Sequence, residues 1–224
     1  MESRRDILGN AGAKHVAVTH KLNVMKVLIT GFEPFLNYTE NSSWVVAEEV
    51  TARGVDGVEI VLKQMPVSFM RAGASLRKVV EESRPDYIVM LGQTGVSDCV
   101  KLERVALNLM DSTLADNDGY KPNEETIYEG MPTAFITPMP IKALCSAVKA
   151  QGVAVKVSNS CGLYVCNRLY YEALKICSES DAMQALFVHL PLYYGQPSAE
   201  GRATMPCEAM VKAIQTIIEE ICQK

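Results

Sequence analysis

In Tyr87-Ile88-Val89-Met90-Leu91-Gly92, five apolar residues run without interruption into a glycine. Similar short runs occur at Lys26–Gly31 and Ala185–His189. Runs of this length that do not alternate with polar residues are typical of strands buried on both faces of a parallel sheet. We therefore expect these runs to form the centre of the fold.

The segments between these runs carry the spacing and end signals of helices and further strands. Gly54, Pro85 and Gly152 mark helix ends, and Pro140 is expected at the first position of a helix. The predicted helices are 43–53, 69–80, 140–151, 163–176 and 205–222, and the further strands are 58–62, 99–109 and 153–157. Strands that alternate with helices predict an α/β fold, a three-layer α/β/α sandwich with a mostly parallel sheet.

Residues 1–25 differ from the rest of the chain because they show no periodicity, and Met25 directly precedes the first strand. We interpret them as an N-terminal extension and residues 26–224 as a single α/β domain, a length that can bury a sizeable core. The sequence shows no internal repeat and no low-complexity tract.

The composition argues against several classes of partner. Hydrophobic residues make up 48% and charged residues 21%, and the net charge is −4. An acidic chain lacks the basic surface that nucleic acids or anionic membranes require. No apolar run approaches the ~18 residues of a membrane-spanning helix, and the N-terminus is a poor secretory signal. Seven cysteines without a compact spacing pattern suggest reduced thiols and a cytoplasmic location. The sequence leaves the oligomeric state open and is compatible with a homo-oligomer.

The residues at the predicted carboxyl ends of the strands are Gly31, Gly92, Ser158 and His189. Ligands of open α/β sheets bind beyond these ends, so we expect separate segments to meet there at one crevice. After position 109 come about twenty residues rich in Asp, Asn, Gly and Pro, and so long a loop in a compact domain indicates a functional role.

Cys166 and His189 point to nucleophilic chemistry at this crevice. The chain has three histidines, and His15 and His20 lie in the expected extension, so His189 is the base available to a cysteine. Cys166 lies near the start of a predicted helix that Asn159 or Ser160 could cap. A helix N-terminus lowers a thiol pKa and offers amides to an oxyanion.

Other interpretations of these residues remain open. Cys166 also fits as a packing residue of its helix, His189 as a hydrogen-bonded structural residue, and Cys161 as a rival nucleophile. Glu103, which opens an apolar strand, is a candidate to orient His189; the alternative is a surface salt bridge with Arg104 or Lys101. The sequence has no metal-site spacing, P-loop or G-x-G-x-x-G, so we expect neither a metal nor a cofactor.

Phe32 and Phe35 flank Pro34 directly after the first strand. Aromatic residues at this place either cap the core or form the wall of a pocket for a small planar ligand.

A set of motifs along the chain resembles pyroglutamyl peptidase I, the pyrrolidone-carboxylate peptidase family. In chain order they are Gly31-Phe32-Glu33-Pro34-Phe35, Asn41-x-Ser43-Trp44, Gly92-Gln93-x-Gly95, Glu103-Arg104-Val105-Ala106-Leu107-Asn108, Asp116-Asn117-x-Gly119, Tyr164-Val165-Cys166-Asn167 and Phe187-Val188-His189-Leu190-Pro191. The resemblance extends from about residue 26 to the C-terminus, and the order of the motifs makes it specific.

The resemblance implies a cysteine peptidase that removes N-terminal pyroglutamate from peptides through a thioester, without a cofactor, on an α/β/α sandwich with a mixed sheet. It implies that Cys166 is the nucleophile, His189 the general base and acid, and Glu103 the orienting carboxylate. The substrate-binding residues that it implies are Phe32, Phe35, Asn41, Gln93, Leu114, Tyr164 and Val165.

The chain departs from the family's pattern in two places. Members often have Gly-Gly-Arg after the Gly-Gln motif, where this chain has Gly95-Val96-Ser97-Asp98, and many have an arginine at the position of Thr113. Two other functions therefore remain as alternatives: a peptide-binding module without catalysis, and a nucleoside phosphorylase on a similar sandwich. The second would need a cluster of basic phosphate ligands, and this crevice offers few.

Overall fold

The structure, a computed structural model, describes residues 24–180 and 182–223. Nearly all of the expected N-terminal extension therefore lies outside the described residues. Met25, which we assigned to the extension, is already the first residue of β1 (Met25–Phe32).

A six-stranded sheet forms the centre of the fold, in the order β2-β1-β3-β8-β4-β7. Its other strands are β2 (Val58–Met65), β3 (Tyr87–Gln93), β4 (Val100–Glu103), β7 (Val155–Ser158) and β8 (Gln184–Leu190). Strands β2, β1, β3 and β8 are parallel, whereas β4 runs antiparallel to β8 and parallel to β7. The sheet is therefore mixed and mostly parallel, which confirms the predicted fold class.

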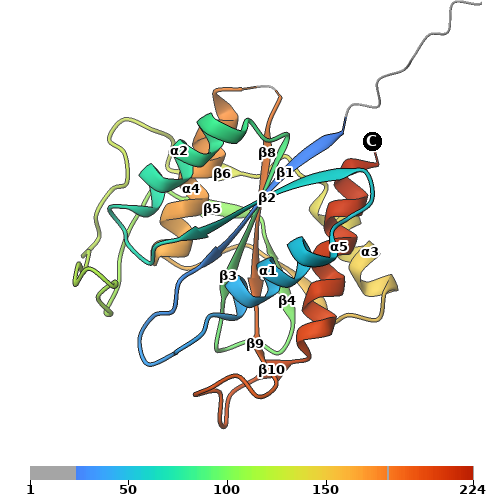
Figure 1. Ribbon diagram of the computed structural model, residues 1–224. Helices are drawn as coiled ribbons and strands as arrows, with labels where there is room; N and C mark the ends of the chain where they lie inside the picture. The colour runs from blue at the N-terminus through green and yellow to red at the C-terminus, as the bar shows by residue number, and fades with distance from the viewer. Residues whose placement is uncertain (1–23, 181, 224) are drawn as a thin grey trace, which may run out of the picture.

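Helices cover both faces of this sheet (Figure 1). They are α1 (Ser42–Arg53), α2 (Ala72–Ser83), α3 (Ile141–Ala150), α4 (Val165–Ser178) and α5 (Cys207–Cys222). Figure 1 shows α2 and α4 on one face and α1, α3 and α5 on the other. Two small ladders complete the described elements: β5 (Val105–Leu107) with β6 (Ala134–Ile136), and β9 (Leu192–Tyr193) with β10 (Thr204–Met205).

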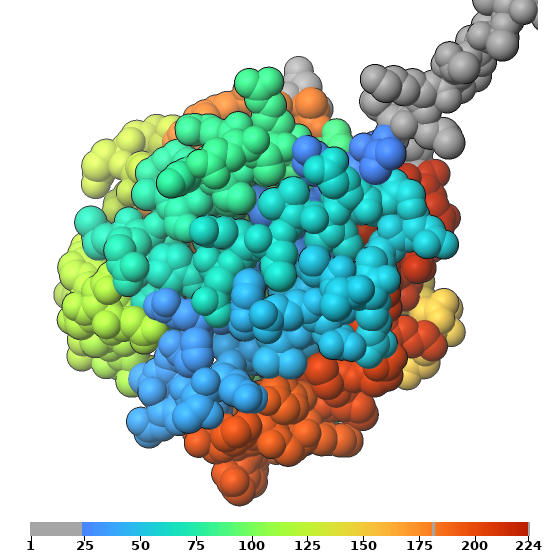
Figure 2. All heavy atoms as spheres, in the orientation of Figure 1, coloured from blue at the N-terminus to red at the C-terminus, as the bar shows by residue number. Residues whose placement is uncertain are grey.

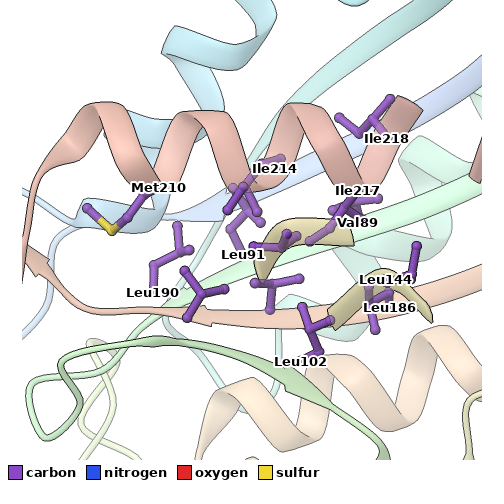
Figure 3. Close-up of a cluster of buried hydrophobic side chains, with 14 of the residues drawn as sticks. Val89, Leu91, Leu102, Leu144, Leu186, Leu190, Met210, Ile214, Ile217 and Ile218 are labelled. Carbon is purple, nitrogen blue, oxygen red and sulfur yellow. The ribbon is translucent and has the colours of Figure 1, made fainter. Parts of the chain in front are cut away.

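Alternate residues of each central strand belong to different cores. On β8, Leu186, Val188 and Leu190 pack with α5 and α3. Figure 3 shows Leu186 and Leu190 beneath Ile214 and Ile217 of α5. Ala185 and Phe187 of the same strand pack with α2 and α4. The apolar runs of the sequence are therefore uninterrupted because both faces of these strands are buried.

Two helix starts differ from the sequence prediction for local reasons. Helix α2 begins at Ala72 and not at Phe69, because the amide of Phe69 donates to buried Asp116 and Ser68 accepts from the amide of Arg71. Pro140 is the residue before helix α3 and not its first residue. Gly54 ends α1 as expected, with a φ of 72° that favours glycine.

The long loop after β5 is held at defined points. Asp116 accepts hydrogen bonds from the amides of Phe69, Asp118 and Tyr120, and Asn117 donates to Glu33 and to the carbonyl of Pro34. Figure 2 shows a second loop contact, between the blue segment after β1 and the orange segment after β9, where Ser198 donates to the carbonyl of Asn37. Several loops therefore meet at one end of the sheet.

Within the described residues, no helix is long and apolar enough to cross a membrane.

Truncation of Ile214 to alanine should lower the free energy of unfolding by about 2–5 kcal/mol. Ile214 is fully buried between α5 and the sheet, so the substitution leaves a cavity. Urea denaturation followed by circular dichroism measures this difference. The control is Glu220→Ala on the exposed side of the same helix, which should change stability by no more than about 0.5 kcal/mol.

Candidate active site

A cavity of about 300 Å³ opens at the carboxyl ends of β1, β3 and β8. Phe32, Gln93 and His189 reach it from the ends of these three strands, and the turn before α4 forms another wall. Because β4 runs in the opposite direction to β8, Lys101 lies beside His189 and Glu103 lies one layer deeper, opposite Phe187. Segments far apart in the sequence thus meet where the α/β pattern predicted a crevice.

Cys166 is the second residue of α4 and lines this cavity. Within the described part of the chain no side chain caps the helix, so its first amides lack a side-chain acceptor at the edge of the cavity. A β-carbon on Gly92 would lie 3.2 Å from the Cys166 sulfur and 2.7 Å from the ring of Phe187. The sulfur therefore lies over the backbone of β3, a position that only glycine at residue 92 allows.

The expected caps of this helix were wrong. Helix α4 begins at Val165, several residues after Asn159 and Ser160, and Tyr164 occupies the capping position. Asn159 accepts a hydrogen bond from Arg104, and Ser160 accepts one from the amide of Gly162. The turn after β7 is longer than the sequence pattern indicated. Asn159 and Ser160 therefore make hydrogen bonds outside the helix start.

Asn167 fixes the start of α4 against β5. Its side-chain oxygen accepts from the amide of Leu107 at 2.9 Å, and its side-chain nitrogen donates to the carbonyls of Leu107 and Leu109. Asn167 is fully buried. The helix that carries Cys166 is therefore bonded directly to the segment that follows Glu103.

His189 and Glu103 form a buried pair. Nδ1 of His189 lies 2.8 Å from Oε1 of Glu103, which leaves Nε2 for Cys166. Glu103 is fully buried, and its other oxygen, Oε2, has no hydrogen-bond partner within the described part of the chain. Glu103 is therefore bound to His189 and does not form the surface salt bridge with Arg104 or Lys101 that the sequence also allowed.

The protonated form of His189 is favoured. Burial alone would lower the pKa of His189, but its hydrogen bonds with Cys166 and Glu103 outweigh burial and raise that pKa from 6.5 to about 9. Both partners stabilise the imidazolium because a thiolate and a carboxylate carry negative charge. The arrangement therefore favours a charged His189 beside Cys166 at neutral pH.

Cys161 is less suited to nucleophilic chemistry than Cys166. Its side chain is buried and donates to the carbonyl of Val105 and to Asn167. Burial, together with the charge of Glu103, raises the pKa of the Cys161 thiol well above its usual value. At neutral pH this thiol stays protonated and bonded to the protein.

Aromatic residues form the apolar part of the cavity. Phe32, Phe35, Tyr164 and Val165 all line it. The rings of Phe35 and Tyr164 lie 6.1 Å apart, and the Tyr164 hydroxyl donates to the carbonyl of Ala115 in the long loop. Phe32 and Phe35 thus contribute to the cavity wall, one of the two interpretations that the sequence allowed.

Asn41 and Gln93 line the cavity and also hold the start of α1. Asn41 accepts from the amide of Ser43 and donates to the carbonyl of Glu33. Gln93 accepts from the amide of Ser42 and from the side chain of Gln196. The side-chain oxygens of Asn41 and Gln93 therefore already accept hydrogen bonds from protein groups.

Leu114 is the one expected pocket residue that does not line this cavity. It is exposed, in the part of the long loop where Ser112 accepts from its amide. Thr113, at the position of the family's arginine, is also exposed and lies outside the lining. Residues 24–180 and 182–223 contain no cluster of His, Cys, Asp and Glu that could hold a metal ion.

The sequence interpretation missed part of the lining, namely Val67, Thr94, Val96, Lys101, Ser160 and Gly162. Most are loop residues without a sequence signal. Lys101 did have a sequence signal. Residues two apart on a strand face the same side, and Glu103 was already a candidate.

Comparisons with known proteins agree on one family. A family model described as pyroglutamyl peptidase matches residues 25–224. A pyrrolidone-carboxylate peptidase of Thermococcus onnurineus is 39% identical over 87% of this chain and 98% of its own length. A relative of the same description from Thermococcus kodakarensis is 36% identical over 88% of this chain and 96% of its own.

Solved structures of similar fold carry the same descriptions. The pyroglutamyl peptidase I of Bacillus amyloliquefaciens superposes with a TM-score of 0.82 at 32% identity, over 86% of this chain and 92% of its own. The pyrrolidone carboxyl peptidase of Thermococcus litoralis gives a TM-score of 0.82 at 30% identity, over 87% and 92%.

Iodoacetamide should label Cys166 faster than Cys161 in the native protein, since the thiolate is the reactive form of cysteine. Peptide mapping by mass spectrometry over a time course measures both rates. In His189→Ala the labelling of Cys166 at neutral pH should slow, because its cationic partner is lost. Faster modification of Cys161 than of Cys166 in the native chain would contradict this assignment.

Proposed function

Because the chain belongs to the pyroglutamyl peptidase family, we propose that Cys166, His189 and Glu103 carry out its reaction. The family's members are cysteine peptidases that remove N-terminal pyroglutamate from peptides. In this chain Cys166 is the nucleophile, His189 the general base and acid, and Glu103 the residue that orients the imidazole. The contact between His189 and Glu103 at 2.8 Å, beside Cys166 in one cavity, carries the proposal.

The pocket for the pyroglutamyl ring follows from the chemistry of that group. Its nitrogen is locked in a lactam, so the ring is small, flat and uncharged. The slot of Phe32, Phe35, Tyr164 and Val165 suits such a ring. An N-terminal glutamate or glutamine would bring a charged ammonium into this slot without a partner, which is unfavourable.

The first half of the reaction forms a thioester. The Cys166 thiolate attacks the carbonyl carbon of the scissile amide, and the carbonyl oxygen becomes an oxyanion. The first amides of α4 are the available donors for that oxyanion. His189 then gives its proton to the leaving nitrogen, the C–N bond breaks, and the rest of the peptide departs as a free amine.

The second half releases pyroglutamate. Neutral His189 accepts a proton from water, the hydroxide attacks the thioester carbon, and the Cys166 thiolate leaves. Glu103 keeps the imidazole in the tautomer that presents Nε2 to Cys166 and balances its positive charge. The cycle consumes one water molecule and returns the thiolate–imidazolium pair.

We also propose that the protein acts in the cytoplasm and that residues 26–224 are one peptidase domain. All seven cysteines are free, including Cys99, Cys145 and Cys222 outside the site. Free thiols persist in reducing compartments.

Cleavage of a pyroglutamyl fluorogenic amide tests the proposal directly. We expect steady turnover by the native chain and a loss of at least about 10³-fold in kcat/KM for Cys166→Ala. His189→Ala should lose about 10²- to 10⁴-fold, as expected when a general acid–base is removed. Glu103→Gln should lose less, because the amide still bonds the ring but does not balance its charge.

Two further variants make the test specific. The double variant of Glu103 and His189 should be little worse than His189→Ala alone, because residues that act as a unit are not additive. Cys145→Ala, a buried cysteine on α3, is the matched control and should retain activity. Binding of the substrate without turnover by the native chain would favour the binding module instead.

The alkaline limit of activity should follow the titration of His189. Since its pKa is raised to about 9, the imidazolium persists through neutral pH and is lost above about pH 9. We therefore expect kcat/KM to fall as pH rises through about 9. The stabilisation from the charged ring is complete below its ordinary pKa of 6.5 and disappears as pH rises toward about 9.

Glu103→Gln should move this alkaline limb to lower pH, because one of the groups that raise the pKa of His189 is removed. Profiles of kcat/KM against pH for both proteins measure the shift. An unchanged limb in Glu103→Gln would mean that a group other than His189 sets it.

A further inference from the structure

The residues of the site form a row across the sheet. In strand order, Phe32 lies at the end of β1, Gly92 on β3, His189 on β8, Lys101 on β4 and Lys156 on β7. Lys101 is the register partner of His189 on one side and of Lys156 on the other. The row therefore begins with an aromatic slot, passes the nucleophile and the base, and ends with two cations.

His189, Lys101 and Lys156, at the basic end of this row, face the side of the sheet that α4 covers. Leu102 and Val188, which alternate with them, lie in the core on the other face of the sheet. Directly opposite residues of an antiparallel pair have β-carbons about 4.5–5.5 Å apart. Lys101 is thus the direct neighbour of His189 on the face that carries the chemistry.

Among residues 24–180 and 182–223, Lys101 has no anionic partner. Its half-buried side chain lines the cavity, and no carboxylate of the described residues lies within 4.0 Å of its amine. Glu103, which faces the same side, is bound to His189. Lys156 beside it is exposed and adds a second positive charge, although like charges on adjacent strands are unfavourable.

The direction of the row relates Lys101 to one part of the substrate. The pyroglutamyl ring belongs in the aromatic slot at the β1 end, and His189 must reach the leaving nitrogen to protonate it. The residue after the scissile bond therefore extends from His189 toward β4. The first charged group that it meets is the amine of Lys101.

We propose that Lys101, supported by the charge of Lys156, binds a carboxylate on the residue that follows pyroglutamate. This inference rests on the proposed peptidase function and narrows its substrate class. The favoured substrates carry an anionic group directly after the scissile bond. That group is either an acidic side chain or the C-terminal carboxylate of a dipeptide, since both present the same chemistry to an ammonium group.

Two pairs of substrates separate charge from shape. Pyroglutamyl-glutamate α-amide and pyroglutamyl-glutamine α-amide differ only in the side-chain carboxylate. Pyroglutamyl-alanine and its amide differ only in the C-terminal carboxylate. We expect the native chain to favour the acidic member of at least one pair by about two- to fivefold in kcat/KM at low salt. The preference should shrink in 1 M salt, where screening extends to about 3 Å.

Substitutions of Lys101 test the origin of the preference. Lys101→Met should bring the ratio between acidic and neutral substrates to about one, and Lys101→Glu should invert it. Lys101→Arg, which keeps the charge, should retain a preference for the acidic member. Lys149→Met on α3 changes the net charge equally at an exposed position away from the site, and should leave the ratio unchanged. Each ratio compares two substrates on one protein sample, so a loss of folded protein does not imitate the effect.

The outcomes distinguish the two proposals. Turnover of the neutral substrates with equal rates on the acidic ones would overturn the inference and leave the peptidase function intact. A preference that survives both Lys101→Met and Lys101→Glu would also overturn it, and would indicate that another cation attracts the carboxylate. Failure of the native chain to cleave any of the four substrates would overturn the peptidase function and this inference together.

Discussion

The hydrogen bond between Glu103 and His189 depends on the antiparallel insertion of β4 between β8 and β7. A parallel strand in this place would bring its carboxyl end to the edge of the sheet. The antiparallel strand instead places Glu103 one layer inside, opposite Phe187, where water is excluded. Because a buried carboxylate requires a charged partner, this position both demands and stabilises the imidazolium of His189.

Cys166, the proposed nucleophile, is held by a second set of contacts that converge on the same point. Because Gly92 has no side chain, the sulfur of Cys166 and the ring of Phe187 both lie close to its backbone. Asn167 bonds the first turn of α4 to β5, which follows β4 in the chain. Cys166 and Glu103 therefore lie on segments that hydrogen bonds connect, so their separation is fixed by packing and not by one flexible loop.

Local patterns predicted the helices and the strands of the central sheet but not the strand order. They missed β6, β9 and β10, and they gave 99–109 as one strand where the structure has β4 and β5. The apolar runs of β1, β3 and β8 were identifiable because strands buried on both faces need uninterrupted apolar sequence. The antiparallel direction of β4 left no such trace, since strand order depends on contacts between distant segments. Helix α2 starts later than its periodicity indicated because Asp116, more than forty residues away, binds the amide of Phe69.

In the candidate site too, some features follow from local sequence and others depend on contacts between distant segments. Cys166, His189 and Glu103 were candidates because His189 is the histidine outside the expected extension, Cys166 lies near a predicted helix start and Glu103 opens an apolar strand. The pocket residues were implied by the family resemblance. Leu114 does not line the cavity, since the course of a long loop is not encoded in local sequence. Lys101 was overlooked although strand alternation alone puts it on the same face as Glu103.

The hydrogen bonds of Asn167 make this position intolerant of even an isosteric exchange. Its nitrogen donates to two carbonyl oxygens, and its oxygen accepts from an amide. An aspartate has the same shape, but it would set a negatively charged oxygen against both carbonyls at the place where the nitrogen now donates. Deamidation of this one side chain, a form of chemical ageing, would therefore separate α4 from β5 and displace the neighbouring sulfur. Asn167 lies in the first turn of α4, whose helical backbone and side-chain hydrogen bonds oppose the attack of the following backbone nitrogen that starts this reaction, so the contacts that align the site also oppose its decay.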